Sequence, residues 1–343
     1  IYCDWGRCCR HLLITSEIDN IDYDVKKWND LVAGYNYNTT YNKTKLESKK
    51  VYPIEYVDCF ESNSLYIAMK KENVNKKRHT HCEIHPCLHM SIYTNTIPLA
   101  NHNQAPRNVF SGQQGKQALG IYATSFNHRI DTASYILHYP QRAILSTKIA
   151  KYAHKNKMPN GENLIVAIVT YTGYNQEDSV ILNSSSVARG MFNVSSFKSI
   201  VQSEDINQNS GVNILFDNPK RLKKEGGNIQ YNYAHWDKID DTGLPIVNSY
   251  ISEDDCYLGM VSMQNQKTVG KDDEIIFSDQ AVNKVYEDVS KIAKKFDNGV
   301  IDNVIKYDRG DGLHEVKIRM RKFKLPELGD KMSSTHGQKG VCG

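Results

Sequence analysis

The chain has 343 residues and a formal net charge of +4, because 43 Lys and Arg stand against 39 Asp and Glu. Its longest apolar run, residues 164–169, is far shorter than the roughly 20 residues that a membrane-spanning helix needs. No basic head followed by an apolar block marks a secretory signal, and the eight cysteines are too sparse and irregular for a disulfide scaffold. We therefore expect neither a membrane-spanning nor a secreted protein, and we expect reduced intracellular thiols.

Four segments in the first half of the chain have a composition or a spacing of apolar residues that predicts their local structure. Residues 21–50 are rich in Asn, Lys, Tyr and Thr without an apolar period, which predicts a solvated insertion or loop. Residues 62–69 predict a strand, and the spacing of the apolar residues in 115–125 predicts a helix. Residues 164–169 are rich in β-branched side chains and follow an Asn-Gly pair, so they predict a buried strand.

The second half alternates polar loops with periodic segments. The pattern predicts the end of a short helix at 187–191, a polar surface loop or flap at 203–227, and a helix at 284–296. In the clearest strand, Val316, Ile318 and Met320 alternate with Lys317, Arg319 and Arg321. A period of two places these three cations on one face. Two interpretations stay open: a basic wall facing a polyanion, or an edge strand charged against aggregation.

A cluster of His and Cys lies between residues 79 and 89, and such side chains can bind zinc. Its members are His79, His81, Cys82, His85, Cys87 and His89. No second Cys/His pair follows at the spacing of a zinc finger, and strand alternation would send His81 and Cys82 to opposite faces. We therefore favour a buried polar strand over a zinc site.

Three polar motifs offer groups for metal or phosphate chemistry. Glu177 and Asp178 follow the apolar run and offer carboxylate oxygens to a hard cation such as Mg²⁺. Lys331 and Lys339 lie in a glycine-rich stretch and supply positive charge for phosphates. Arg107, in a proline turn, suits a bidentate phosphate contact. Taken alone, each pattern is also typical of a solvated turn or loop with exposed charges.

Three long motifs in collinear order resemble the second-largest subunit of multisubunit DNA-directed RNA polymerases, the counterpart of bacterial β. They are residues 102–120 (HNQAPRNVFSGQQGKQALG), 173–183 (GYNQEDSVILN) and 329–340 (GDKMSSTHGQKG). Shorter stretches agree at residues 4–10, 56–69, 81–86 and 238–250. The resemblance therefore covers most of the chain, with the insertion at 21–50 and the loop at 203–227 as exceptions.

The resemblance implies a mixed α/β, β-rich fold and an internal fragment of a longer subunit. The hybrid-binding domain of this family is built around a double-psi β-barrel, and small external domains precede it. Residues 1–56 would be an external region similar to domain 4, with the Asn/Lys-rich insertion, and residues 57–78 one similar to domain 5. Residues 79–343 would be the hybrid-binding domain, similar to domain 6 and truncated at its C-terminal end.

The resemblance also implies nucleotidyl transfer, in which the RNA 3′ hydroxyl attacks the α-phosphate of an incoming NTP with two Mg²⁺ ions. The aspartates that hold the first ion belong to the family's largest subunit, so this chain would act only within the assembled enzyme. The matching motifs assign six residues. Arg107, Lys331 and Lys339 would be catalytic and contact the NTP phosphates and the RNA end, Gln117 would lie near the RNA–DNA hybrid, and Glu177 and Asp178 would share the second Mg²⁺.

The implied partners are the largest subunit, the other polymerase subunits, template DNA, nascent RNA and NTPs, with no membrane. The family's zinc is expected outside this segment. The Asn/Lys/Tyr-rich texture indicates an AT-rich genome, so we expect the nucleus or, for a viral protein, a cytoplasmic virus factory or virion. Two other functions fit the same residues: a stand-alone nucleic-acid-binding module of the same fold, and a metal-dependent nuclease that uses Glu177 and Asp178.

Overall fold

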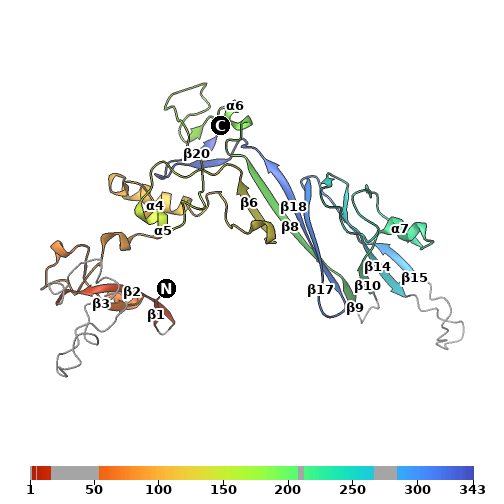
Figure 1. Cartoon of the computed structure of the whole chain (residues 1–343), viewed down its shortest axis with the longest axis horizontal. Helices are drawn as coiled ribbons and strands as arrows, with labels where there is room; N and C mark the ends of the chain where they lie inside the picture. Colours follow the sequence, from red (N-terminus) through yellow and green to blue (C-terminus); the bar gives the residue numbers. More distant parts are fainter. Residues whose placement is uncertain (1, 5, 17–53, 208–211, 266–283) are drawn as a thin grey trace. The chain divides into compact units, whose positions relative to one another are not determined.

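The computed structural model describes residues 2–4, 6–16, 54–207, 212–265 and 284–343 (Figure 1). The chain divides into two compact units. Unit 1 comprises residues 1–113, 147–149 and 335–337, and unit 2 comprises residues 114–146, 150–334 and 338–343. Both units are built on β-sheets with short helices, so the predicted mixed, β-rich fold is confirmed. The predicted insertion at 21–50 lies outside the described residues.

Unit 1 is organised around a five-stranded sheet of order β1-β2-β5-β4, with β3 paired to β2. The strands are β1 (Tyr2–Asp4), β2 (Arg7–Ile14), β3 (Ile54–Val57), β4 (Ile67–Ala68) and β5 (His81–Cys82). Its helices are α2 (Cys59–Asn63), α3 (Ile92–Asn95) and α4 (Ala105–Gln114). Leu13, Ile54, Ala68 and Cys82 form the core under the sheet. Burying each larger aliphatic side chain contributes about 1.5–3 kcal/mol.

Two predictions in this part of the chain are corrected by capping chemistry. The predicted strand at 62–69 is reduced to β4, because Asp58 accepts hydrogen bonds from the amides of Phe60 and Glu61 and starts α2 in front of it. The helix predicted at 115–125 is wrong, since the helix lies one segment earlier, in α4. Pro106 favours a helix start because its fixed φ suits the first turn, and Gly115 follows the last helical residue.

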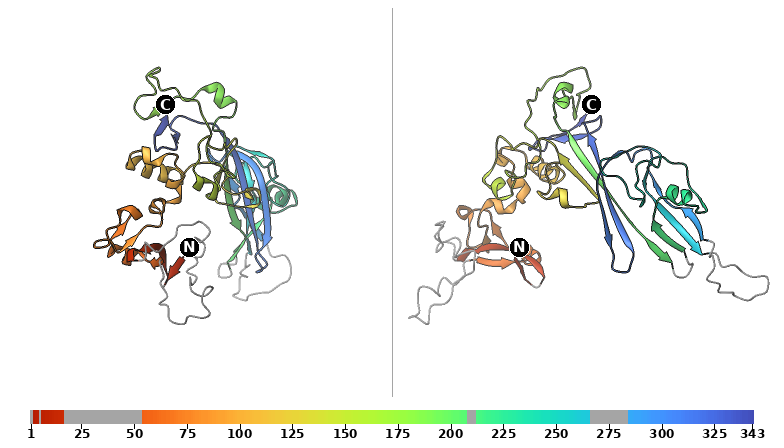
Figure 2. Two further views of the ribbon diagram at one scale, coloured as in Figure 1. Left: turned by 60° about the vertical axis from the view of Figure 1, so that its left-hand side comes forward. Right: turned by 45° about the vertical axis from the view of Figure 1, so that its right-hand side comes forward.

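The largest sheet of unit 2 has the order β12-β17-β18-β8-β6 and is antiparallel throughout. Its strands are β6 (Ala133–Leu137), β8 (Val194–Ser203), β12 (Tyr250–Ile251), β17 (Gly299–Asp308) and β18 (His314–Lys324). The two views of Figure 2 show the green and blue strands β8, β17 and β18 running side by side. The alternation predicted for β18 is confirmed, because Val316, Ile318 and Met320 are buried in the core of this unit.

The cationic face of β18 differs from both interpretations of the sequence. β18 lies between β17 and β8, so it is not an edge strand. Arg319 is only 6% exposed, and its Nε donates to Asp302 at 2.7 Å while Nη1 donates to the carbonyls of Phe126 and Arg129. Arg321 lies 3.7 Å from the same carboxylate. Internal partners therefore hold these charges, and no free basic wall results.

A second five-stranded sheet of unit 2 has the order β11-β15-β14-β10-β9. Its strands are β9 (Asp205–Asn207), β10 (Val212–Phe216), β11 (Ile229–Gln230), β14 (Met260–Asn265) and β15 (Lys284–Asp288). The prediction of a surface loop at 203–227 is wrong, because this region contains β9, β10 and the helix α7 (Pro219–Lys224). Its polar side chains mislead because some of them, such as Glu204 and Asn218, accept hydrogen bonds from backbone amides and so support regular structure.

The predicted helix at 284–296 is also wrong. The region forms β15 and the short strand β16 (Lys291–Ile292), which pairs with β13 (Cys256–Leu258). A helix would place Val289 and Phe296 on one face, but Val289 packs on the core while Phe296 is 84% exposed. Antiparallel pairing of β15 with β14 overrides the helical spacing here.

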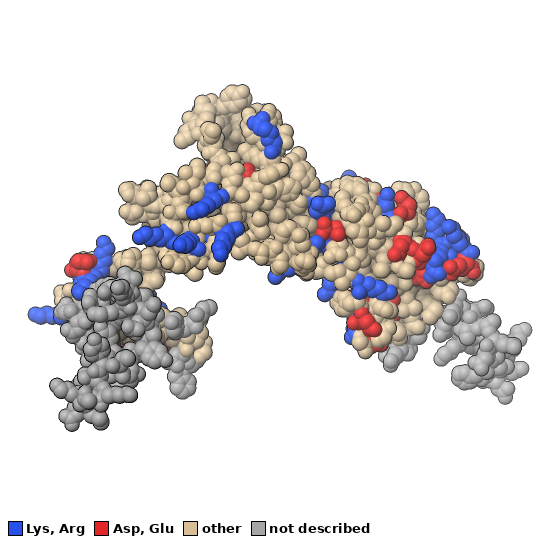
Figure 3. Space-filling model, in the orientation of Figure 1, with Lys and Arg blue, Asp and Glu red and all other residues tan. Residues whose placement is uncertain are grey.

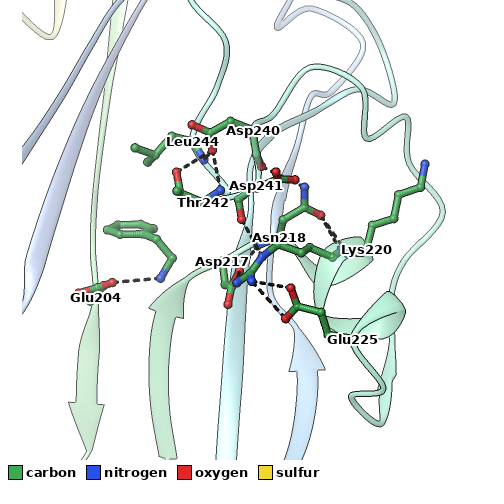
Figure 4. A network of polar contacts seen from close by, with 11 residues as sticks. Glu204, Asp217, Asn218, Lys220, Glu225, Asp240, Asp241, Thr242 and Leu244 are labelled. Carbon is green, nitrogen blue, oxygen red and sulfur yellow. Dashed lines mark hydrogen bonds and ion pairs between the residues drawn. The ribbon is translucent and has the colours of Figure 1, made fainter.

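A network of polar side chains fixes α7 to the neighbouring loop (Figure 4). Arg221 donates through Nη2 to Asp217 at 2.7 Å, through Nη1 to Glu225 at 2.9 Å and through Nε to the carbonyl of Asp241 at 3.0 Å. The side-chain bond and charge of Asp217, followed by those of Glu225, raise the pKa of the Arg221 guanidinium. Figure 3 shows blue and red side chains side by side over α7. The visible surface of this helix therefore carries mixed charge.

A small three-stranded sheet completes unit 2, with β19 (Lys331–Ser333), β20 (Lys339–Cys342) and β7 (Ser179–Val180) in the order β19-β20-β7. Helices α5 (Lys148–Tyr152) and α6 (Ser184–Ala188) are short. The helix end predicted at 187–191 is confirmed by α6. Across the described ranges no sheet closes into a barrel, and every helix is too short or too polar to cross a lipid bilayer.

The buried strand predicted at 164–169 is wrong. These residues have no regular secondary structure, and Ile165 and Ile168 are 106% and 101% exposed. Asn175 holds the end of the run, since its Nδ2 donates to the carbonyl of Val169 at 2.6 Å and its Oδ1 accepts from the amide of Tyr171 at 3.1 Å. The run is thus an apolar segment that nothing among the described residues covers.

Candidate functional site

The β19–β20 hairpin carries the two candidate lysines. Its antiparallel register pairs Lys331 with Val341 and Ser333 with Lys339. Because directly opposed residues share a face and alternate residues return to it, both lysines project from the same face. They occupy diagonal positions, which lie about 7–8 Å apart in such a pair. Both side chains are exposed, so the hairpin concentrates two positive charges at one place.

Strand β7 brings the acidic motif beside this hairpin. β20 and β7 are parallel, and the amide of Val341 donates to the carbonyl of Asp178 at 2.7 Å. The amide of Gly343 donates to the carbonyl of Val180 at 3.0 Å. A Cβ at Gly340 would lie only 2.9 Å from Val180 Cγ1 and 3.0 Å from the Asp178 carbonyl, so any larger residue would force these groups to shift. Two motifs that are far apart in the sequence thus form one sheet.

The carboxylates of Glu177 and Asp178 are exposed and available to a ligand. Neither forms a hydrogen bond or an ion pair with another residue of the described part of the chain. Glu177 has a φ of 54°, in the left-handed region that non-glycine residues rarely adopt. The backbone bond from Ser179 to the Gln176 carbonyl at 3.1 Å closes the turn around them. The loop therefore presents two charged groups directly before β7.

The number of carboxylates at this loop suits magnesium. Magnesium is usually held by one or two carboxylates together with waters and substrate phosphates. Glu177 and Asp178 offer that number of carboxylates, and no group of three or more His, Cys, Asp or Glu in the described residues is placed to hold a metal ion. A cation at this loop would therefore need further ligands from a substrate, from water or from another chain.

Arg107 lies in unit 1, on α4, and packs on residues 335–337 at the tip of the hairpin, which also belong to unit 1. Its Nη1 lies 3.5 Å from the carbonyl of Gly337, and Ser111 Oγ donates to the carbonyl of Thr335 at 2.7 Å. Gly337 has a φ of 79°, and a Cβ there would lie 2.4 Å from the carbonyl of Arg107. The glycine is thus required both by its backbone angle and by close contact.

Sequence reasoning missed the residues that hold this tip. Ser111 is buried, and Asn103 Nδ2 lies 3.0 Å from His336 Nδ1. Each of these residues lies inside one of the quoted motifs, which was the available signal. The polar side chains of these residues did not distinguish them from residues of a solvated loop.

Gln117 belongs to unit 2 and lies in the turn that follows α4. Its amide donates to the carbonyl of Gln114 at 3.0 Å, which fixes the backbone of the turn. The side chain is exposed, and no hydrogen bond to it is found within the described ranges. Its position is therefore open to a ligand.

The His and Cys cluster has a structural arrangement in β5 and the residues around it. His81 and Cys82 are both buried, as favoured from the sequence. His81 Nε2 lies 2.7 Å from Glu55 on β3, and Cys82 packs in the core of unit 1. The cluster thus supplies a buried polar strand.

Comparison with known proteins identifies the class. Residues 93–343 match the family described as RNA polymerase Rpb2, domain 6. This match covers most of the chain, including all six candidate residues. The chain therefore belongs to the family of second-largest subunits of DNA-directed RNA polymerase.

Individual relatives come from plants, viruses and archaea. The chain is 35% identical to DNA-directed RNA polymerase II subunit 2 of Arabidopsis thaliana, over 100% of this chain and 28% of the relative. It is 32% identical to DNA-directed RNA polymerase subunit 2 of Acanthamoeba polyphaga mimivirus and 32% identical to subunit Rpo2 of Sulfolobus acidocaldarius. Both of these matches cover 100% of this chain and 29% of the relative. The chain thus spans under a third of the length of these relatives.

Proposed function

We propose that this chain is the part of the second-largest polymerase subunit that completes the active centre together with the largest subunit. In this role it binds the RNA–DNA hybrid, the NTP phosphates and the second Mg²⁺ during DNA-templated RNA synthesis. The observation that carries the proposal is the β19-β20-β7 sheet. It joins two exposed lysines to the strand that follows two free carboxylates.

The arrangement suits charge stabilisation in phosphoryl transfer. Lys331 and Lys339 neutralise negative charge on the phosphates and at the RNA end, where charge develops as the 3′ hydroxyl attacks. Arg107 offers a forked guanidinium to NTP phosphates, and Gln117 offers an amide to the hybrid. Glu177 and Asp178 hold the magnesium that travels with the NTP, and this ion neutralises phosphate charge when it is bound. The largest subunit supplies the remaining metal ligands.

The exposed run at 164–169 supports the proposal of a double-psi β-barrel. Apolar β-branched residues that precede β7 in the chain are suited to pairing with further strands. We propose that parts of the subunit outside this chain supply those strands and close the barrel. In this division residues 1–56 resemble domain 4, residues 57–78 resemble domain 5, and residues 79–343 form the hybrid-binding domain.

The proposed partners follow from the family. They are the largest and other polymerase subunits, template DNA, nascent RNA and NTPs, and the family's zinc lies elsewhere in the subunit. The plant relative is named as a subunit of RNA polymerase II, and another relative is viral. The proposed location is accordingly the nucleus, or a virus factory or virion.

The test is RNA extension by the whole polymerase carrying Lys331→Glu or Lys339→Glu. We expect assembly to survive, because both side chains are exposed, and extension to fall at least 100-fold, because one charge reversal exceeds the loss of a single oriented donor. Lys306→Glu is the matched control, since Lys306 is also an exposed strand lysine, on β17. Extension at the wild-type rate in both site variants would refute the assignment.

The same material separates the alternatives. Magnesium-dependent cleavage of nucleic acid by the isolated chain, lost in Glu177→Gln and Asp178→Asn, would identify a nuclease. Binding of an RNA–DNA hybrid by the isolated chain with no incorporation into a polymerase would identify a stand-alone module. We expect the isolated chain to lack cleavage activity and the intact subunit to be incorporated.

A further inference from the structure

The β1–β2 hairpin of unit 1 brings two exposed cysteines face to face. Its register pairs Cys3 directly with Cys8, and Asp4 with Arg7. Both cysteines are exposed and both are free thiols. No part of the candidate polymerase site lies on this hairpin, and the chemistry of the pair has no role in the proposed function.

The backbone geometry of such a pair matches that of a disulfide. Directly opposed residues in antiparallel strands have Cα atoms about 4.5 or 5.5 Å apart, depending on the kind of pair. Disulfides span Cα separations of about 4.4–6.8 Å, so either kind of pair lies within range. Desolvation and then the hydrogen bond and charge of Cys8 raise the pKa of the Cys3 thiol.

We propose that Cys3 and Cys8 form a redox-active dithiol, which a small-molecule disulfide oxidises to an intramolecular disulfide across the β1–β2 hairpin. Exposure favours this behaviour, because exposed disulfides are the ones that cellular thiols reduce again. The site is a reversible modification site on the surface of unit 1.

The exchange balances in two steps. The thiolate of Cys8 attacks a sulfur of the oxidant, and the oxidant releases one thiol. The thiolate of Cys3 then attacks the Cys8 sulfur of the mixed disulfide and releases the second thiol. The cysteine pair loses two electrons and two protons, and the oxidant becomes two thiols.

Four of the other six cysteines illustrate how the pair differs from its neighbours. Burial raises the pKa of Cys256 to about 12 and also raises that of Cys82, which keeps both thiols protonated and unreactive. Cys9 follows Cys8 on β2 and therefore projects from the opposite face, where its Sγ donates to the carbonyl of Arg7 at 3.5 Å. Cys59 is exposed but lies on α2. Cys9 and Cys59 are thus suitable controls.

The test uses the whole 343-residue chain with oxidised glutathione as the probe. Free thiols are then blocked, and the protein is digested with trypsin without reductant. Cleavage after Arg7 and Arg10 places Cys3 in peptide 1–7 and Cys8 in peptide 8–10. We expect the two peptides to be linked, and the intact protein to lose two of its eight titratable thiols.

Variants separate the pair from its neighbours. Cys3→Ser and Cys8→Ser should abolish the linked peptide, while Cys9→Ser and Cys59→Ser should retain it. The oxidised wild-type chain should also unfold at a higher denaturant concentration than the reduced chain, and Cys3→Ser should lose this shift. Stable glutathione adducts on Cys3 or Cys8 without linkage would overturn the proposal. So would linkage that survives Cys8→Ser and disappears in Cys9→Ser, because Cys9 would then be the partner.

Discussion

The contribution of a charged residue in unit 2 depends on its bonding partners, and the exposure of its side chain alone does not show them. Arg319 and Arg321 share Asp302, yet only Arg319 is buried and also bonded to two carbonyls. Glu204 is 5% exposed and accepts hydrogen bonds from the amides of His314 at 2.8 Å and Phe216 at 3.1 Å. Residues of the same charge on the same sheet therefore differ widely in how much they contribute to the free energy of unfolding.

Arg319→Ala tests this difference. Removing the guanidinium leaves two carbonyls without their donor and leaves Asp302 with only the more distant Arg321, at 3.7 Å, so we expect the free energy of unfolding to fall by about 3 kcal/mol. Lys317→Ala on the same strand should change it by less than about 1 kcal/mol, because that lysine is half exposed. Urea unfolding of both variants measures the difference, and equal effects would contradict it.

Glu204 should make unit 2 sensitive to acid. Burial opposes its ionisation, but the amide bonds from His314 and Phe216 and the bond from the His314 ring outweigh burial and lower the pKa of Glu204 below 4.5. A depressed pKa stabilises the folded state above the unfolded value, and this contribution is lost as pH falls through the folded value. Urea unfolding from pH 7 downward should show stability falling below about pH 4.5. The fall should be smaller in Glu204→Gln, and an identical profile would exclude this carboxylate.

At the scale of elements, tight contacts give a structural reason for the motif at 238–250, which the sequence identified only by its resemblance to the family. Gly243, inside the motif at 238–250, has a φ of 80°, and a Cβ there would lie 2.7 Å from the carbonyl of Asp217. The neighbouring Asp240 accepts hydrogen bonds from the amides of Thr242 and Leu244, both at 2.9 Å (Figure 4). This motif therefore builds a turn against α7.

Gly243→Ala should destabilise the fold by more than backbone strain alone. Gly310 has nearly the same φ, 84°, but nothing lies within 4 Å of its Cβ position. We expect Gly310→Ala to cost about 1 kcal/mol and Gly243→Ala to cost clearly more, because the carbonyl of Asp217 must move. Thermal or urea unfolding of the two variants gives the comparison. Equal costs would show that the close approach carries no energy.

The sequence predicted elements well where local pattern and tertiary pairing agree, as in β18. It failed at 284–296, where a helical spacing is overridden by pairing with β14, and at 164–169, where an apolar run has no covering element among the described residues. The candidate site was predicted only through its motifs. The bond between the Asp178 carbonyl and the Val341 amide joins residues far apart in the chain, and no local pattern encodes such a pairing.

At the scale of the whole molecule, the chain covers under a third of its relatives and leaves an apolar run exposed. Ile165→Lys together with Ile168→Lys should leave the unfolding free energy of this chain unchanged within about 0.5 kcal/mol, because both side chains are already solvated. In the full-length subunit the same changes should reduce incorporation into polymerase, measured by co-purification with the largest subunit. Normal incorporation would contradict the proposed barrel closure.

The parallel pairing of β20 with β7 has a mechanical consequence. The Val341 amide is held by the carbonyl of Asp178, so the lysine hairpin and the acidic loop cannot separate without breaking that bond. Slow deuterium uptake at Val341 would therefore report that both groups are held in register, and rapid uptake would report that they drift independently. The rate of deuterium uptake at the Val341 amide thus measures how rigidly the lysine hairpin and the acidic loop are held together.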